Sequence, residues 1–110
     1  MSTVHMVFMT APDEAVASSL GRALVEAGLA ACANLIPGVR SIYRWKGEIC
    51  DDGEWLVLFK TTNEHLDSLR EQIIELHPYE CPEVLVVDVD GGAPDYLKWV
   101  IQQVSGKDSS

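Results

Sequence analysis

The sequence predicts an α+β fold in which strands and helices follow the order β-α-β-β-α-β, with an added helix at the end. Two observations lead to this prediction. Apolar runs rich in β-branched and aromatic residues alternate with segments whose apolar residues recur every three or four positions, as in buried strands and amphipathic helices. Glycine, proline and asparagine separate these segments. The 110 residues, 47 % hydrophobic and 23 % charged, suit a single domain over residues 1–110.

The first strand is expected over residues 4–10, which are apolar and rich in β-forming side chains. Pro12 then suits the first helical position, and two acidic residues follow in the favourable first turn. The helix is expected to run to about Ala27, because Gly28 is a good left-handed stop. Its apolar stripe, at spacings of four, four and three, consists of Val16, Leu20, Leu24 and Ala27.

A long strand is expected next. Residues 29–36 form a near-continuous apolar run, and β-forming residues resume over 39–45. The intervening Pro37-Gly38 is interpreted as a bend or bulge within one strand.

The chain is then expected to turn at Lys46-Gly47 and to return over residues 54–62. The returning segment is apolar on both faces, as in a central strand. The acidic residues and glycine at 51–53 are interpreted as an irregularity in this return.

Thr62 or Asn63 is expected to cap a second helix, in which apolar residues recur at three, four and three positions. These residues are Leu66, Leu69, Ile73 and Leu76. A last strand is expected over residues 84–89, followed by a helix that begins at Pro94-Asp95 and by a flexible tail at about 107–110. The order is that of a ferredoxin-like sandwich, with helices on one face of an antiparallel sheet.

The predicted length of the second strand does not fit a monomer. A strand from about residue 29 to residue 45 would span roughly 50 Å at about 3.3 Å per residue. A compact domain of this size has a radius of gyration of about 13 Å. The hairpin should therefore overhang its own domain and expose four large side chains on open edges: Ile42, Tyr43, Trp45 and Trp55. Such edges need a partner chain.

The net charge of −9 argues against nucleic acids and anionic membranes as partners. The N-terminal segment carries no basic region, and its apolar run is too short for a signal peptide or a membrane span, so a cytoplasmic location is expected. Three cysteines without a CxxC pair make a disulfide framework improbable. Cys32, Cys50 and Cys81 are therefore core residues, metal ligands or reactive thiols.

The stretch from His77 to Glu83, HPYECPE, is rich in chemically active groups. It holds an imidazole, a thiol, a phenol and two carboxylates between two prolines, which favour extended backbone before them. The structural alternative is that the prolines only connect a helix to a strand, with His77 a helix-end imidazole that bonds a carbonyl and Cys81 a small buried group.

Six motifs occur in one order along the chain: TAPDEA at 10–15, LAACANLIPG at 29–38, SIYRWKG at 41–47, KTT at 60–62, HPYE with PE at 77–83, and DYLKW at 95–99. In these motifs the chain resembles the CutA-type divalent-cation tolerance proteins almost from end to end. The resemblance implies a ferredoxin-like homotrimer similar to the PII signalling proteins, in which long hairpins join sheets between subunits.

The resemblance also implies copper binding. Cys32 and His77 match ligand positions of bacterial members, whereas Met9 stands where a first-strand thiol would be and Leu76 where a second histidine often is. Because this set is rich in soft sulfur, Cu(I) is expected to bind better than Cu(II) or Zn(II). The structural alternative for Cys32 is a core position.

A polar ligand pocket at a subunit seam is a second hypothesis, and interface packing is its alternative. The residues concerned are Tyr43, Trp45, Lys60, Glu83, Tyr96 and Trp99, of which Lys60 and Glu83 could simply pair. No common nucleotide-binding, serine-hydrolase or zinc-protease motif occurs, so no enzymatic role is expected. Three function classes remain: a trimeric metal-tolerance protein, a PII-like module that binds a small ligand or a protein partner, and a stable scaffold.

Overall fold

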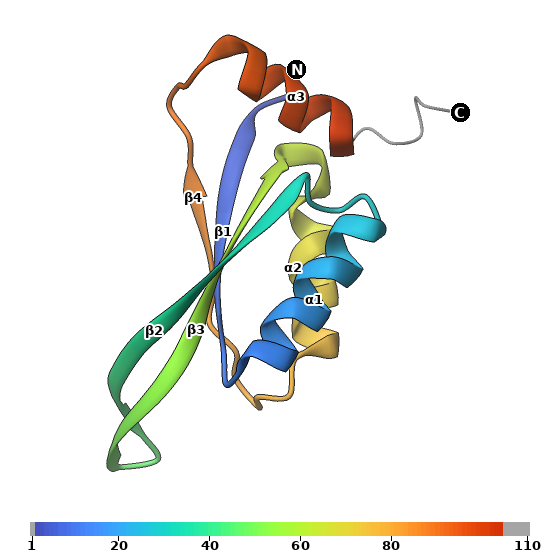
Figure 1. The fold of residues 1–110 in the computed structure, drawn as a ribbon. Coiled ribbons are helices and arrows are strands. Elements are labelled where there is room, and N and C mark those ends of the chain that lie inside the picture. The colour runs from blue at the N-terminus through green and yellow to red at the C-terminus, as the bar shows by residue number, and fades with distance from the viewer. Residues whose placement is uncertain (1, 105–110) are drawn as a thin grey trace.

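The computed structural model describes residues 2–104, in which two helices cover one face of an antiparallel sheet and a third lies at its end (Figure 1). The elements are β1 (Val4–Ala11), α1 (Glu14–Glu26), β2 (Cys32–Trp45), β3 (Glu48–Thr62), a 3₁₀ helix (Asn63–His65), α2 (Leu66–Leu76), β4 (Val84–Asp88) and α3 (Pro94–Val104). The strand order is β2-β3-β1-β4, and every neighbouring pair is antiparallel. The predicted ferredoxin-like fold is confirmed. The tail predicted at 107–110 lies outside the described residues.

Helix α1 begins at Glu14, two residues after Pro12, which the sequence suggested as its first residue. The side chain of Asp13 accepts a hydrogen bond from the backbone N–H of Val16 at 2.9 Å, so Asp13 is the cap and Pro12 precedes it. The helix ends before Gly28, whose φ of 76° is the expected left-handed stop. Its buried residues are Ala17, Leu20, Gly21 and Leu24, whereas the predicted stripe residue Ala27 is exposed.

The long hairpin of β2 and β3 has one irregularity, in β2. The register shifts between Ile36 and Val39, and Gly38 has a φ of 83°, so the predicted bulge at Pro37-Gly38 is confirmed. The second irregularity, expected at residues 51–53, was a wrong prediction because these residues pair in regular register with residues 40–42. The hairpin extends beyond the helices and the principal axis of the molecule measures 47 Å (Figure 1).

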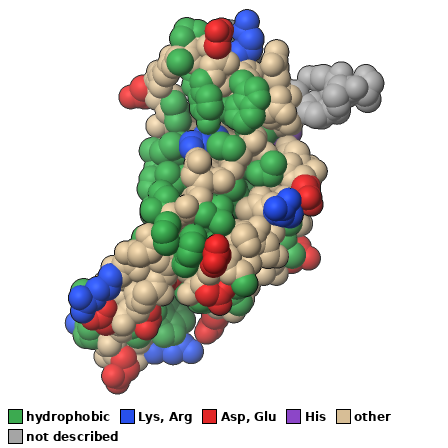
Figure 2. Space-filling model, in the orientation of Figure 1, with side chains coloured by type: hydrophobic (Ala, Val, Ile, Leu, Met, Phe, Trp, Pro, Cys, Tyr) green, Lys and Arg blue, Asp and Glu red, His purple; other side chains and the backbone are tan. Residues whose placement is uncertain are grey.

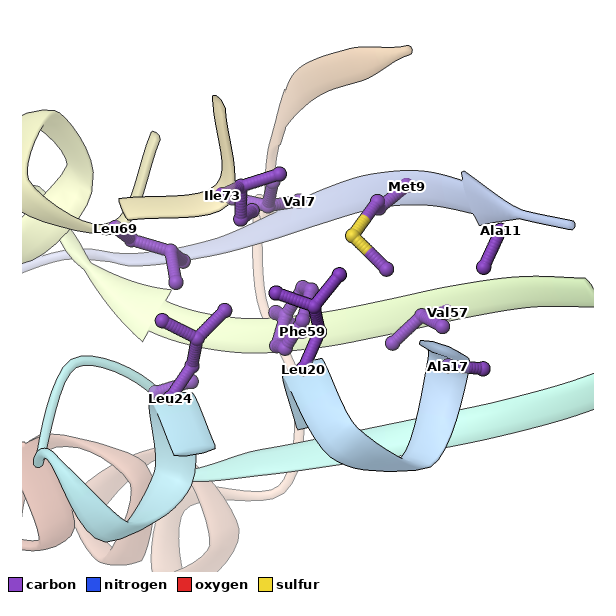
Figure 3. Packing of buried hydrophobic residues seen from close by; sticks show 11 residues of the cluster. Val7, Met9, Ala11, Ala17, Leu20, Leu24, Val57, Phe59, Leu69 and Ile73 are labelled. Carbon is purple, nitrogen blue, oxygen red and sulfur yellow. The ribbon is translucent and has the colours of Figure 1, made fainter. Parts of the chain in front are cut away.

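The main core lies between the sheet and helices α1 and α2 (Figure 3). Alternate residues of β1, including Val7 and Met9, point towards the helices together with Val57 and Phe59 of β3. A smaller cluster joins α3 to the other side of the sheet through Val4, Ala31, Val100 and Val104. Within residues 2–104, no helix is long and apolar enough to cross a membrane.

The sheet face that points away from α1 and α2 is here called the open face, because α3 covers only one end of it. Leu85 and Val87 of β4 pair with residues of β1 that are out of phase with the core, so they lie on this face. Leu85 is 57 % exposed and Val87 is 42 % exposed. Figure 2 shows hydrophobic side chains gathered over the sheet between α3 and the hairpin. Among residues 2–104, the part of this apolar surface around Leu85 and Val87 is left exposed.

The hairpin exposes most of the side chains expected on its edges. Ile42, Tyr43 and Trp45 are all exposed, as the sequence predicts. The predicted exposure of Trp55 is wrong, because this side chain is half-buried and packs against the main core.

Candidate functional site

A cleft of about 820 Å³ lies between the long hairpin and the segment that follows α2. This segment, residues 77–83, is the HPYECPE stretch, here called the proline loop. The side chains of the cleft that matter chemically are Tyr43, Trp45, Asp52, Glu54, Tyr79 and Glu83. The cleft therefore brings together the hairpin and the loop singled out from the sequence.

His77 fixes the start of the proline loop. Its backbone ends α2 and turns to an extended conformation, with ψ 139°, before Pro78. Its ring is buried, with Nε2 2.7 Å from the carbonyl oxygen of Thr10 and Nδ1 3.1 Å from the backbone N–H of Tyr79. A carbonyl only accepts and an N–H only donates, so the ring is neutral and carries its hydrogen on Nε2. The structural alternative for His77, an imidazole that bonds a carbonyl, is confirmed.

Two tyrosine–carboxylate pairs line the cleft. The hydroxyl of Tyr79 donates to Glu54 at 2.8 Å, and the hydroxyl of Tyr43 donates to Asp52 at 2.7 Å. Glu54 is buried, with 8 % of its surface exposed. Two residues apart on β3, Asp52 and Glu54 point to the same side of the strand.

The pKa values of both phenols are raised in the cleft. The hydrogen bond to Asp52, followed by burial, raises the pKa of Tyr43 to about 12. Burial, followed by the hydrogen bond to Glu54, raises the pKa of Tyr79 well above its ordinary value. Both hydroxyls therefore remain protonated donors at neutral pH.

The six residues predicted for a ligand pocket divide into two groups. Tyr43, Trp45 and Glu83 line the cleft. Lys60, Tyr96 and Trp99 are not among the residues that line it. The structure thus places half of the predicted set in one cavity of the chain.

Lys60 and Tyr96 belong to a cluster at the α3 end of the open face. The ammonium group of Lys60 donates to the side-chain oxygen of Asn34 rather than pairing with Glu83. The thiol of Cys32 lies 3.7 Å from the hydroxyl of Tyr96, whose ring centroid is 5.6 Å from that of Trp99.

The three residues predicted to bind copper do not converge within one chain. Met9 is fully buried and points towards the helices. Cys32 pairs with Lys60, which in turn pairs with Met6, so all three belong to the row that faces the open side. Because His77 uses both ring nitrogens, it offers no free ligand atom. Among the described residues, no group of three or more His, Cys, Asp or Glu side chains is placed to hold a metal ion.

The model of the family described as CutA1 divalent ion tolerance protein matches residues 5–103. The chain belongs to this family. The divalent-cation tolerance protein CutA of Thermus thermophilus is 45 % identical over 96 residues, which cover 87 % of this chain and 93 % of that protein. The mouse protein CutA is 47 % identical over 100 residues, which cover 91 % of this chain but only 56 % of the mouse protein.

Solved CutA structures share the fold over almost the whole chain. CutA from Xylella fastidiosa has a TM-score of 0.90 and 38 % identity, with coverage of 93 % of this chain and 98 % of that one. A structure from Archaeoglobus fulgidus, described as a periplasmic divalent cation tolerance protein, has a TM-score of 0.88 and 28 % identity, covering 92 % and 98 %. These family names describe tolerance to divalent cations and not a chemical reaction.

Sequence reasoning missed Asp52 and Glu54 as residues of this CutA cleft. Asp52 was assigned to an irregular segment, and Glu54 only marked the start of a strand. Their spacing could have indicated the pair, because residues two positions apart in a strand point to the same side, which places both carboxylates together. What the spacing could not provide was the proximity of Tyr79, which is 25 residues further along the chain than Glu54.

Proposed function

We propose that this CutA-family protein acts in the response to divalent cations as a cytoplasmic homotrimer that binds copper. The observation that carries the proposal is the open face of the sheet. Its exposed apolar residues include Leu85 and Val87 of β4, and the outer edge of this strand has no partner strand among the described residues. Such an edge and such a face call for further chains.

A cyclic trimer would give a partner to both edges of the sheet. β2 and β4 are the edge strands of the described sheet, so a head-to-tail contact between unlike edges would use both. The overhanging hairpin of β2 and β3 supplies the length that such a contact requires. Closure after three subunits follows the expectation drawn from the family resemblance.

Cys32 is the member of the predicted copper set that remains in position to bind a metal. Its thiol is half-buried on the open face, whereas a metal at Met9 would open the core and a metal at His77 would break two hydrogen bonds. Thiolate sulfur favours Cu(I). Titration of the pure protein with Cu(I) should therefore show a lower affinity in Cys32→Ser. Met9→Leu, the matched control, should bind Cu(I) as tightly as the wild type does. Unchanged Cu(I) binding in Cys32→Ser would contradict the assignment.

The cellular role is tested by deletion of the gene and growth at graded copper concentrations. Cells that lack the protein should be more sensitive, and the wild-type gene should restore growth better than the Cys32→Ser gene. Equal growth of deleted and wild-type cells over the whole series would contradict the proposal. Fractionation of the same cells should recover the protein with cytosolic markers, and recovery with envelope markers would contradict the proposed location.

A small-ligand module similar to the PII proteins is the second candidate function. The cleft favours it, because a volume of about 820 Å³ lies within the range of small-molecule sites and because polar groups of known orientation line it. The predicted residues Tyr43, Trp45 and Glu83 are part of this cleft. Binding of any small molecule that is weakened by Glu83→Gln would support this function.

A further inference from the structure

We propose that the cleft between the hairpin and the proline loop binds an organic ammonium group, such as one end of a small diamine. The proposal rests on the second candidate function, because it takes the cleft as a ligand site, and it names the class of ligand. Three properties of the cleft lead to it: the charge of its lining, its aromatic walls and the state of its carboxylates.

The lining of the cleft is negative. Four acidic side chains contribute to it: Asp52, Glu54, Glu80 and Glu83. No lysine or arginine is among the described residues that line the cleft. The ammonium group of Lys46, at the hairpin tip, lies at the rim, 3.5 Å from Glu80 and 5.7 Å from the ring centroid of Trp45. A phosphate or carboxylate ligand would meet repulsion here, so the cleft selects against nucleotides and acidic metabolites.

Aromatic rings form a second part of the lining. Tyr43 and Trp45 come from the hairpin and Tyr79 from the proline loop, so both sides of the cleft present aromatic surface. The ring of Tyr79 is held against that of His77, with centroids 4.6 Å apart. Aromatic faces attract ammonium groups, and tryptophan does so most strongly.

The carboxylates retain acceptor sites for such a group. Oδ2 of Asp52 accepts from Tyr43, and Oε2 of Glu54 accepts from Tyr79. An ionised carboxylate has about four lone-pair positions, so each can accept a further hydrogen bond. Because the tyrosines hold these side chains in place, little side-chain entropy would be lost when a ligand binds.

An ammonium group fits these features better than a bare metal ion does. The described residues place no three His, Cys, Asp or Glu side chains where they could share one ion. An ammonium group needs only hydrogen-bond acceptors and apolar or aromatic surface around its carbon chain. The volume of about 820 Å³ also leaves room for an organic molecule.

The test uses 1,4-diaminobutane as the probe and isothermal titration calorimetry of the full chain at fixed salt. Glu83→Gln removes an exposed charge from the cleft, and Glu71→Gln makes the same change on the outside of α2. We expect Glu83→Gln to weaken binding by roughly tenfold, because the lining loses one negative charge, and Glu71→Gln to leave binding unchanged. Trp45→Leu should weaken binding by about threefold.

The outcomes distinguish an ammonium site from a site for another kind of ligand. No heat with diaminobutane up to millimolar concentration, or equal weakening by Glu71→Gln and Glu83→Gln, overturns the ammonium site. 1,4-Butanediol and glutarate serve as uncharged and anionic probes of similar length. If either binds more tightly than the diamine and Glu83→Gln alters that binding, the cleft is a ligand site but not for ammonium. If none of the three binds, the ammonium proposal fails, whereas binding of a different small molecule that is weakened by Glu83→Gln would still support the second candidate function.

Discussion

His77 provides the sharpest test of a structural role against a metal-binding role. In His77→Ala the carbonyl of Thr10 loses its donor at 2.7 Å, and the N–H of Tyr79 loses its acceptor at 3.1 Å. Each lost hydrogen bond costs about 1 kcal/mol, and each buried polar group left without a partner adds to this. The buried ring is also removed. We expect the free energy of unfolding to fall by about 3 kcal/mol in total.

The assay is urea unfolding followed by circular dichroism, at one protein concentration because assembly affects apparent stability. His65→Ala is the matched control. Nδ1 of its half-buried ring lies 3.1 Å from the hydroxyl of Thr62, so a loss of about 1 kcal/mol is expected. If His77→Ala loses no more than His65→Ala does, the proposed hydrogen-bonding role of His77 is refuted. Abolished Cu(I) binding in a fully stable His77→Ala protein would assign the residue to the metal instead.

Two further predictions concern the cleft and helix α1. Asp52→Asn should lower the pKa of Tyr43 from about 12 towards its ordinary value of 10, which tyrosinate absorbance measures during an alkaline titration. The raised pKa means that the folded protein holds this proton more tightly, so the stabilisation is complete below pH 10 and is lost as the pH rises towards 12. An unchanged titration would show that Asp52 does not cause the shift. Asp13→Ala should lower the free energy of unfolding by about 1 kcal/mol through loss of the α1 cap, whereas exposed Ser19→Ala should change it little, and equal effects would contradict the capping role.

Local patterns in the sequence predicted the fold well. The spacing of Leu69 and Ile73 gives the buried side of α2, and both are fully buried. Pro37-Gly38 marks the bulge, because proline cannot donate to the ladder and glycine accepts a positive φ. Pro12 was misplaced because both it and Asp13 suit a helix start, and only the hydrogen bond to Val16 identifies the cap.

The site was predicted less well, for reasons of geometry. Met9 and Cys32 lie on different strands, and the register of β1, β3 and β2 decides which face each one occupies. That register is not visible in either segment alone. The cleft depends on the path of the hairpin, which brings Glu54 to Tyr79 across 25 positions. Periodicity reports the side on which a residue points but not its long-range neighbours.

The central claim is that the open face of the sheet is covered by other copies of the chain. Sedimentation equilibrium at micromolar concentration tests it most directly, and the expected mass is three times the 12.1 kDa of the chain. Leu85→Asp on the open face should reduce the mass to that of one chain, whereas Ile74→Asp on α2, 52 % exposed, should leave it unchanged. A stable wild-type species of 12.1 kDa would contradict the claim and the copper site proposed on that face.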